Sequence, residues 1–139
     1  MKHALVADDN TVSQRLLAGL LRPLGFQVDI VSDGRAAVRA LAQRAYDLIL
    51  MDCEMPTVSG HEATLAIRVR EVDGALNHTP IIAVTAFSGE FSREQCLAVG
   101  MDAFLEKPVA LEALRQAVRA VMPAPPAVAE DTLDNAAEA

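Results

Sequence analysis

Five polar residues each follow an apolar run of the sequence: Asp8, Asp9, Asp52, Thr85 and Lys107. Three carboxylates held close together repel one another, and a hard divalent cation with oxygen ligands, such as magnesium, relieves that repulsion. One carboxylate can then act as a nucleophile toward a phosphoryl group. A lysine and a hydroxyl nearby would neutralise and hydrogen-bond the transferred oxygens. A lone aspartate after a strand is usually a turn or cap residue, but the five together favour phosphoryl transfer.

These residues can meet only if the runs that precede them are neighbouring strands. The runs cover residues 4–7, 28–31, 48–51, 81–84 and 103–105. Most are nearly continuous in apolar character, which is typical of strands buried on both faces. Amphipathic stretches alternate with them, so we predict a doubly wound α/β domain of three layers with a five-stranded parallel sheet. The carboxyl ends of parallel strands share one edge, where ligands bind, and the five residues should converge there.

The first helix is predicted to begin at Thr11, with Gln14 as the partner in a capping box. Its apolar pattern continues to Leu24, and Gly25 is the expected stop.

The third helix is predicted to open at Ser59, with Glu62 as its capping-box partner and Val69 among its apolar positions. The second helix should begin near residues 33–34. The fourth should start between residues 88 and 92 and end at Gly100, and the fifth should follow Pro108.

Length and composition exclude several classes of protein. The chain has 139 residues, 52% of them hydrophobic, a net charge of −7 and a sequence pI near 4.8. This size suits one domain. The acidic charge argues against direct binding of nucleic acid. No apolar run approaches the roughly 20 residues of a membrane span, and the N-terminus does not read as a signal peptide. Cys53 and Cys96 are expected to be buried thiols in a cytosolic protein.

The last 17 residues differ in character from the body. Residues 123–139 are rich in proline and alanine, carry four acids and lack a basic residue. Such a segment buries little apolar surface. We therefore predict a folded domain over residues 1–122 and a disordered or linker tail over residues 123–139.

The motifs in order resemble the receiver domains of two-component and phosphorelay signalling. They are VADDN after the first strand, LILMDCEMPTVSG, PIIAVTAFS and GMDAFLEKPV. Together they cover residues 2–121, and the detail of MDCEMP and EQCLAVGMDAFLEKP is most similar to receivers of hybrid histidine kinases. The resemblance implies a flavodoxin-like (βα)5 fold with strand order 2-1-3-4-5. It also implies a cytoplasmic location, either alone or as the cytoplasmic part of a membrane-bound sensor kinase.

The resemblance assigns roles to individual residues of the site. Asp52 would be the phosphoacceptor, and Lys107 and Thr85 would contact the phosphoryl group. Asp9, Asp52 and the backbone carbonyl of Glu54 would ligate magnesium, for which manganese is a substitute. Asp8 would act through a bound water.

The resemblance also implies a switch and a docking surface. Thr85 and Phe104 would rearrange on phosphorylation, and the Lys107–Pro108 bond would be cis. Val12, Leu16 and Pro108 would meet the partner, a histidine kinase or a histidine phosphotransfer domain, although Leu16 is as readily a core residue. Glu54 and a second variable position, Phe87, would tune the phosphoryl lifetime.

Other activities fit the sequence less well. A docking module of the same fold without phosphoryl transfer remains an alternative, and a small phosphate-ester hydrolase is a remoter one. As a receiver, the chain would promote its own phosphorylation, and also its own dephosphorylation at a slow rate, rather than act as a conventional enzyme. It would do so either as a separate protein or as a fragment of a hybrid histidine kinase. Whether it dimerises on phosphorylation stays open. His61 is expected at a solvated helix start, and the three histidines have no metal-ligand spacing.

Overall fold

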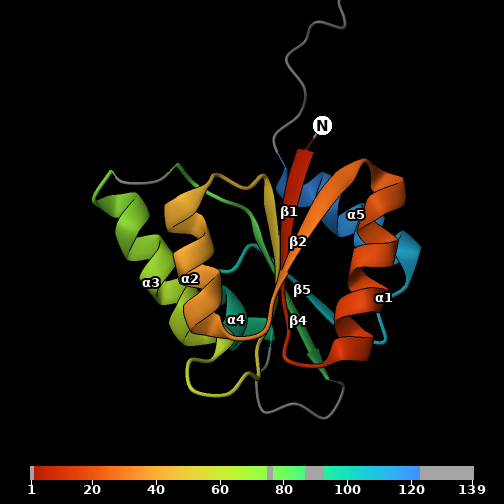
Figure 1. Cartoon of the computed structure of the whole chain (residues 1–139), viewed down its shortest axis with the longest axis horizontal. Helices are drawn as coiled ribbons and strands as arrows, with labels where there is room; N and C mark the ends of the chain where they lie inside the picture. The colour runs from red at the N-terminus through yellow and green to blue at the C-terminus, as the bar shows by residue number, and fades with distance from the viewer. Residues whose placement is uncertain (1, 75–76, 87–92, 123–139) are drawn as a thin grey trace, which may run out of the picture.

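Strands and helices alternate along the described part of the chain, as Figure 1 shows for the computed structural model. The structure describes residues 2–74, 77–86 and 93–122. The strands are β1 (Lys2–Ala7), β2 (Phe26–Val31), β3 (Leu48–Asp52), β4 (Ile81–Ala86) and β5 (Ala103–Lys107). The helices are α1 (Thr11–Leu21), α2 (Gly34–Gln43), α3 (Gly60–Val72), α4 (Arg93–Ala98) and α5 (Leu111–Val121), with a 3-10 turn, η1 (Arg22–Leu24), after α1.

The five strands form one parallel sheet in the order β2-β1-β3-β4-β5. This confirms the predicted doubly wound α/β fold and its strand order. The central strands β1, β3 and β4 are buried almost throughout, in agreement with their continuous apolar runs. The strands extend up to two residues beyond the predicted runs, because the paired segments include polar residues at their ends.

Helices cover both faces of the sheet (Figure 1), and an apolar layer lies under each set of helices. One contains Leu5, Ile49, Ile67 and Cys96 and lies under α2, α3 and α4. The other contains Val6, Leu17, Leu50 and Leu114 and lies under α1 and α5. Successive residues of a strand point to opposite faces, which is why Leu5 and Val6 serve different layers.

The beginning of α1 differs from the prediction. Asn10 is the N-cap, and its side chain accepts a hydrogen bond from the backbone N–H of Ser13. The predicted capping box between Thr11 and Gln14 is therefore wrong, and Gln14 Nε2 instead donates to the carbonyl oxygen of Asp8 at 2.6 Å. An asparagine directly before the helix is an equally good cap.

The ends of the helices follow local rules in most places. The α-helix stops at Leu21, earlier than the apolar pattern suggested, because Pro23 lies in the 3-10 turn that follows. Gly25 ends that turn with φ of 96°, as a stop glycine should.

Helix α3 has the predicted capping box between Ser59 and Glu62. Val69 is 59% exposed, so its assignment to the apolar face was wrong. The predicted start of the fourth helix lies outside the described residues. Among the described residues, no helix is long and apolar enough to cross a bilayer.

Candidate functional site

The sheet register brings the predicted polar residues to one edge. Ala7 of β1 is level with Met51 of β3, so Asp8, directly after β1, and Asp52, the last residue of β3, lie at the same height. Asp52 in turn pairs with Val84, which precedes Thr85. Carboxylate oxygens of Asp8, Asp9 and Asp52 lie within 4.8 Å of one another. Residues at the ends of three strands that are distant in the sequence therefore lie at one edge of the sheet.

Lys107 closes the pocket from the end of β5. Its Nζ lies 2.9 Å from Asp8 Oδ2 and 3.5 Å from Asp52 Oδ2. The Lys107–Pro108 peptide bond is cis. Burial on its own lowers the pKa of Lys107, but the charges and hydrogen bonds of Asp8 and Asp52 together raise it by more. The pKa of Lys107 therefore lies above its ordinary value. The lysine therefore stays charged and offsets part of the negative charge of the pocket.

Asp8 is buried and held by the start of α1. The Asn10 N–H donates to Asp8 Oδ1 at 2.9 Å, and Ser13 Oγ donates to Asp8 Oδ2 at 2.6 Å. Neither Asn10 nor Ser13 was predicted as a site residue. Asparagine and serine are common at helix starts, and only the tertiary structure shows that Asn10 and Ser13 also hold the Asp8 carboxylate in place.

Asp52 is 6% exposed, and burial is the largest cause that raises its pKa to about 6. The nearby charges of Asp8 and Asp9 raise it further, whereas Lys107 and the backbone N–H of Glu54, which donates to Oδ1 at 3.1 Å, lower it. A carboxylate that is costly to ionise among like charges favours a bound cation.

Thr85 is 1% exposed, and its hydroxyl has no hydrogen-bond partner among the described residues. A buried hydroxyl without a partner is costly, and this one lies in β4, one residue after Val84, which pairs with Asp52. The switch candidate Phe104 is half-buried and packs on the layer under α2, α3 and α4. Phe87 lies outside the described residues.

The donor set suits magnesium. Three carboxylates in one cluster supply hard oxygen ligands, and Asp9 is exposed and open to a hydrated ion. The backbone N–H of Glu54 is directed to Asp52, which places that residue next to the cluster.

The three predicted docking residues line one groove beside this pocket. Val12 and Leu16 of α1 face Pro108, and the groove encloses about 390 Å³. Val12 is 76% exposed and Leu16 is 47% exposed, so Leu16 is not a core residue. Lys107 lines the groove as well as contacting the two buried carboxylates. A partner in the groove would therefore lie next to Asp52.

The sequence model of one protein family, the response regulator receiver domain, matches residues 4–119 of this chain. The chain belongs to this family. The receiver is 41% identical over 113 residues to hybrid signal transduction histidine kinase B of Dictyostelium discoideum, a match that covers 76% of this chain and 6% of that protein. In eight such kinase relatives the match spans between 6% and 15% of the length of the relative. The chain's homology to receivers of hybrid histidine kinases confirms the resemblance noted in the motifs.

Solved receivers share the fold. The receiver domain of sensor histidine kinase PA1611 from Pseudomonas aeruginosa, with a magnesium ion coordinated in its active site cleft, matches with a TM-score of 0.75 and 39% identity, covering 86% of this chain and 97% of that one. A co-crystal structure of the Saccharomyces cerevisiae histidine phosphotransfer protein Ypd1 and the receiver domain of Ssk1 matches with a TM-score of 0.80 and 26% identity, covering 94% of each chain.

Proposed function

We propose that this receiver accepts a phosphoryl group on Asp52 from a phosphohistidine. The observation that carries the proposal is the buried Asp52 carboxylate within one cluster with Asp8, Asp9 and Lys107. A pure docking module has no need of three carboxylates that repel one another, nor of a lysine held between two of them.

The transfer requires one bond to form and one to break. An Asp52 carboxylate oxygen attacks phosphorus, the phosphorus–nitrogen bond breaks, and its electron pair stays on the imidazole, which takes up a proton from solvent. Lys107 Nζ neutralises charge on the transferred oxygens, and the Thr85 hydroxyl donates to one of them. Asp9, Asp52 and the Glu54 carbonyl would hold magnesium, with Asp8 acting through a water, and the ion would supply neutralising charge for the phosphoryl oxygens. Manganese should serve in its place.

The switch that follows uses Thr85 and Phe104. When the Thr85 hydroxyl turns to the phosphoryl group, it vacates space beside β4, and Phe104 repacks toward that space. The result is a shift in the equilibrium between two arrangements of the face formed by α4, β5 and α5. Phosphorylation-dependent association of two copies on that face is one output of this shift.

The donor is a histidine kinase or a histidine phosphotransfer protein. The groove lined by Val12, Leu16 and Pro108 adjoins the pocket through Lys107, and the match to the Ypd1–Ssk1 structure supports a histidine phosphotransfer protein as the partner. The working location is the cytoplasm, either as a separate receiver or as the cytoplasmic receiver of a membrane-bound sensor kinase.

Intact mass after incubation with acetyl phosphate and magnesium tests phosphoryl acceptance. We expect the wild-type chain to gain one phosphoryl group, and we expect this gain to disappear in Asp52→Asn and on addition of EDTA. Asp73→Asn is the matched control, because Asp73 is exposed at the end of α3, outside the pocket. No adduct on a chain that still binds magnesium would favour the docking module.

A second experiment tests the docking groove with phosphorylated Ypd1 as the donor. Val12→Asp should slow transfer at least about tenfold, since a charge replaces an exposed apolar contact, while phosphorylation by acetyl phosphate stays unchanged. Val72→Asp is the matched control, because Val72 is 85% exposed on α3, in the opposite helix layer. Equal transfer rates for Val12→Asp and Val72→Asp would remove the groove from the proposal.

A further inference from the structure

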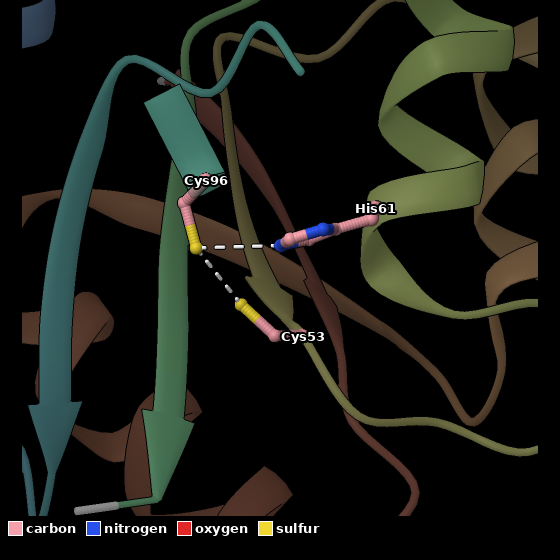
Figure 2. Close-up of side chains that lie close together, drawn as sticks. All are labelled: Cys53, His61 and Cys96. Carbon is pink, nitrogen blue, oxygen red and sulfur yellow. Dashed lines mark hydrogen bonds between the residues drawn. The ribbon is translucent and has the colours of Figure 1, made fainter. Parts of the chain in front are cut away.

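Two sulfur atoms and an imidazole nitrogen meet on the α3 and α4 side of the sheet, outside the acidic pocket. Cys53 follows β3, His61 lies in the first turn of α3, and Cys96 lies in α4 (Figure 2). The two sulfur atoms are 3.4 Å apart, and His61 Nε2 lies 3.4 Å from Cys96 Sγ. All three donor atoms lie within 4.8 Å of one another.

The cluster is buried, and burial raises the pKa of both thiols. Both cysteines are free and fully buried, as the sequence predicted. His61 is half-buried with its ring turned inward, so the prediction of a solvated histidine at this helix start is wrong (Figure 2). Burial lowers the pKa of His61, and a neutral imidazole nitrogen can donate its lone pair to a metal.

The separations of the donor atoms suit a tetrahedral ion. Metal–sulfur bonds of about 2.3 Å and metal–nitrogen bonds of about 2.0 Å at tetrahedral angles place neighbouring ligand atoms roughly 3.5–3.8 Å apart. The two observed separations of 3.4 Å are close to that value. A disulfide would instead require the sulfur atoms to approach to about 2.05 Å. The cluster is therefore nearer to the geometry of a metal site than to that of a disulfide.

We propose that Cys53, His61 and Cys96 form a binding site for a thiophilic divalent cation of the zinc class. Binding would release the two thiol protons to solvent, and the two thiolates would balance the charge of the ion. The fourth position would hold a water or an external ligand, as in open three-ligand zinc sites. Ligand softness separates this site from the acidic cluster of Asp8, Asp9 and Asp52, whose oxygen donors suit magnesium.

The ion would connect three elements that the sequence places far apart. It would join α4 to the end of β3 and to the start of α3, directly beside Asp52. The proposal is independent of phosphoryl transfer, because none of its three ligands belongs to the acidic pocket.

Cobalt titration of the reduced full chain, with magnesium in excess, tests the proposal. We expect one equivalent of cobalt to give thiolate-to-cobalt charge-transfer absorption and the visible bands of a tetrahedral ion. Zinc should remove both signals by displacement. Absence of the charge-transfer absorption from the wild-type chain would overturn the proposal.

Variants identify the ligands in the same titration. Cys96→Ser should abolish the charge-transfer absorption, and His61→Gln should weaken cobalt binding at least about tenfold. His78→Gln is the matched control, because His78 is exposed and pairs with Glu71 and Asp102 instead. Circular dichroism and magnesium binding show that each variant is folded. An absorption that survives Cys96→Ser, or that is lost in Asp9→Asn, would overturn the assignment.

Discussion

The Asp52 carboxylate has a pKa of about 6 because it is buried and faces two further carboxylates. Its pKa in the folded chain is higher than the ordinary value of 3.8. The folded state therefore binds this proton more tightly than the unfolded state does, and ionisation of Asp52 opposes folding. That cost is present above about pH 6, and it disappears as the pH falls through the ordinary value.

The first prediction concerns Asp52→Asn without divalent cations. At pH 7.5 the variant should raise the free energy of unfolding by about 1–3 kcal/mol, and the gain should shrink toward zero near pH 4. Urea denaturation of both proteins at the two pH values measures this. A variant less stable than wild type at pH 7.5 would contradict the charge argument. Magnesium should raise the free energy of unfolding of the wild type much more than that of Asp52→Asn.

The second prediction concerns the buried hydroxyl of Thr85, for which the described residues offer no hydrogen-bond partner. Thr85→Val should leave the free energy of unfolding unchanged or raise it by up to about 1 kcal/mol, because it removes a buried polar group without a partner. The same change should shorten the lifetime of the phosphorylated chain, since the phosphoryl oxygen loses its donor. Unfolding and the decay of the mass adduct are the two measurements.

Thr64→Val is the control for Thr85→Val. Thr64 is also fully buried with a hydroxyl that lacks a partner among the described residues, but it lies in α3. It should show the same small effect on stability and none on the adduct. If the two variants change the adduct lifetime equally, Thr85 has no direct contact with the phosphoryl group.

At the scale of elements, the start of α3 fixes the end of β3. The N–H of Gly60 donates to the carbonyl oxygen of Cys53 at 3.2 Å. A Cβ on Gly60 would lie 2.2 Å from the backbone oxygen of Asp52, which is too close for any real contact. The position of the proposed phosphoacceptor thus depends on a residue without a side chain at the first position of the next helix.

The third prediction compares two glycine substitutions. Gly60→Ala should destabilise the fold by at least about 2 kcal/mol, because backbone must move to relieve the overlap. Gly19→Ala should stabilise it by about 0.5–1 kcal/mol, since Gly19 lies in α1 with open space around it. Denaturant unfolding of the two variants and the wild type checks both signs. Equal effects would show that the approach of α3 to β3 does not constrain the site.

Arg68 shows how one helix binds to the distant edge of the sheet. It lies in α3, and its guanidinium pairs with Glu71 at 2.8 Å and with Asp102 at 2.9 Å. It also donates to the backbone oxygens of Thr79 and Gly100. These contacts join α3 to the segments that lead into β4 and β5, and periodicity in the sequence does not indicate them.

At the scale of the whole molecule, the body of the chain forms one parallel sheet covered on both faces. The matched family region ends at residue 119, and the described structure ends at Met122. Residues 123–139 lie outside the described residues, so their interpretation as a linker or disordered tail stays a prediction from composition.

The fourth prediction concerns this tail. Truncation after Met122 should change the free energy of unfolding by less than about 0.5 kcal/mol, because a segment poor in large apolar residues contributes little buried surface. The truncated chain should also keep its phosphorylation by acetyl phosphate. A larger loss of stability would show that the tail packs on the domain, and the predicted boundary at residue 122 would then be wrong.

The sequence by itself determined the local elements and the chemistry of the pocket. Apolar runs indicated the strands, Ser59 and Glu62 indicated a helix start, and the residues after the runs indicated a carboxylate cluster. These features succeed because they depend on neighbours within a few positions, or on the rule that parallel strands end at one edge. The strand order itself came from resemblance to a family.

Only the tertiary structure decided which distant side chains touch. It placed Lys107 closer to Asp8 than to Asp52, made Ser13 a partner of Asp8, and brought His61 to Cys96. No spacing in the sequence predicts these contacts, because they depend on how α1, α3 and α4 pack on the sheet. The physical reason is that side-chain distances across elements are fixed by packing of the whole core, whereas capping and periodicity are fixed by the local backbone.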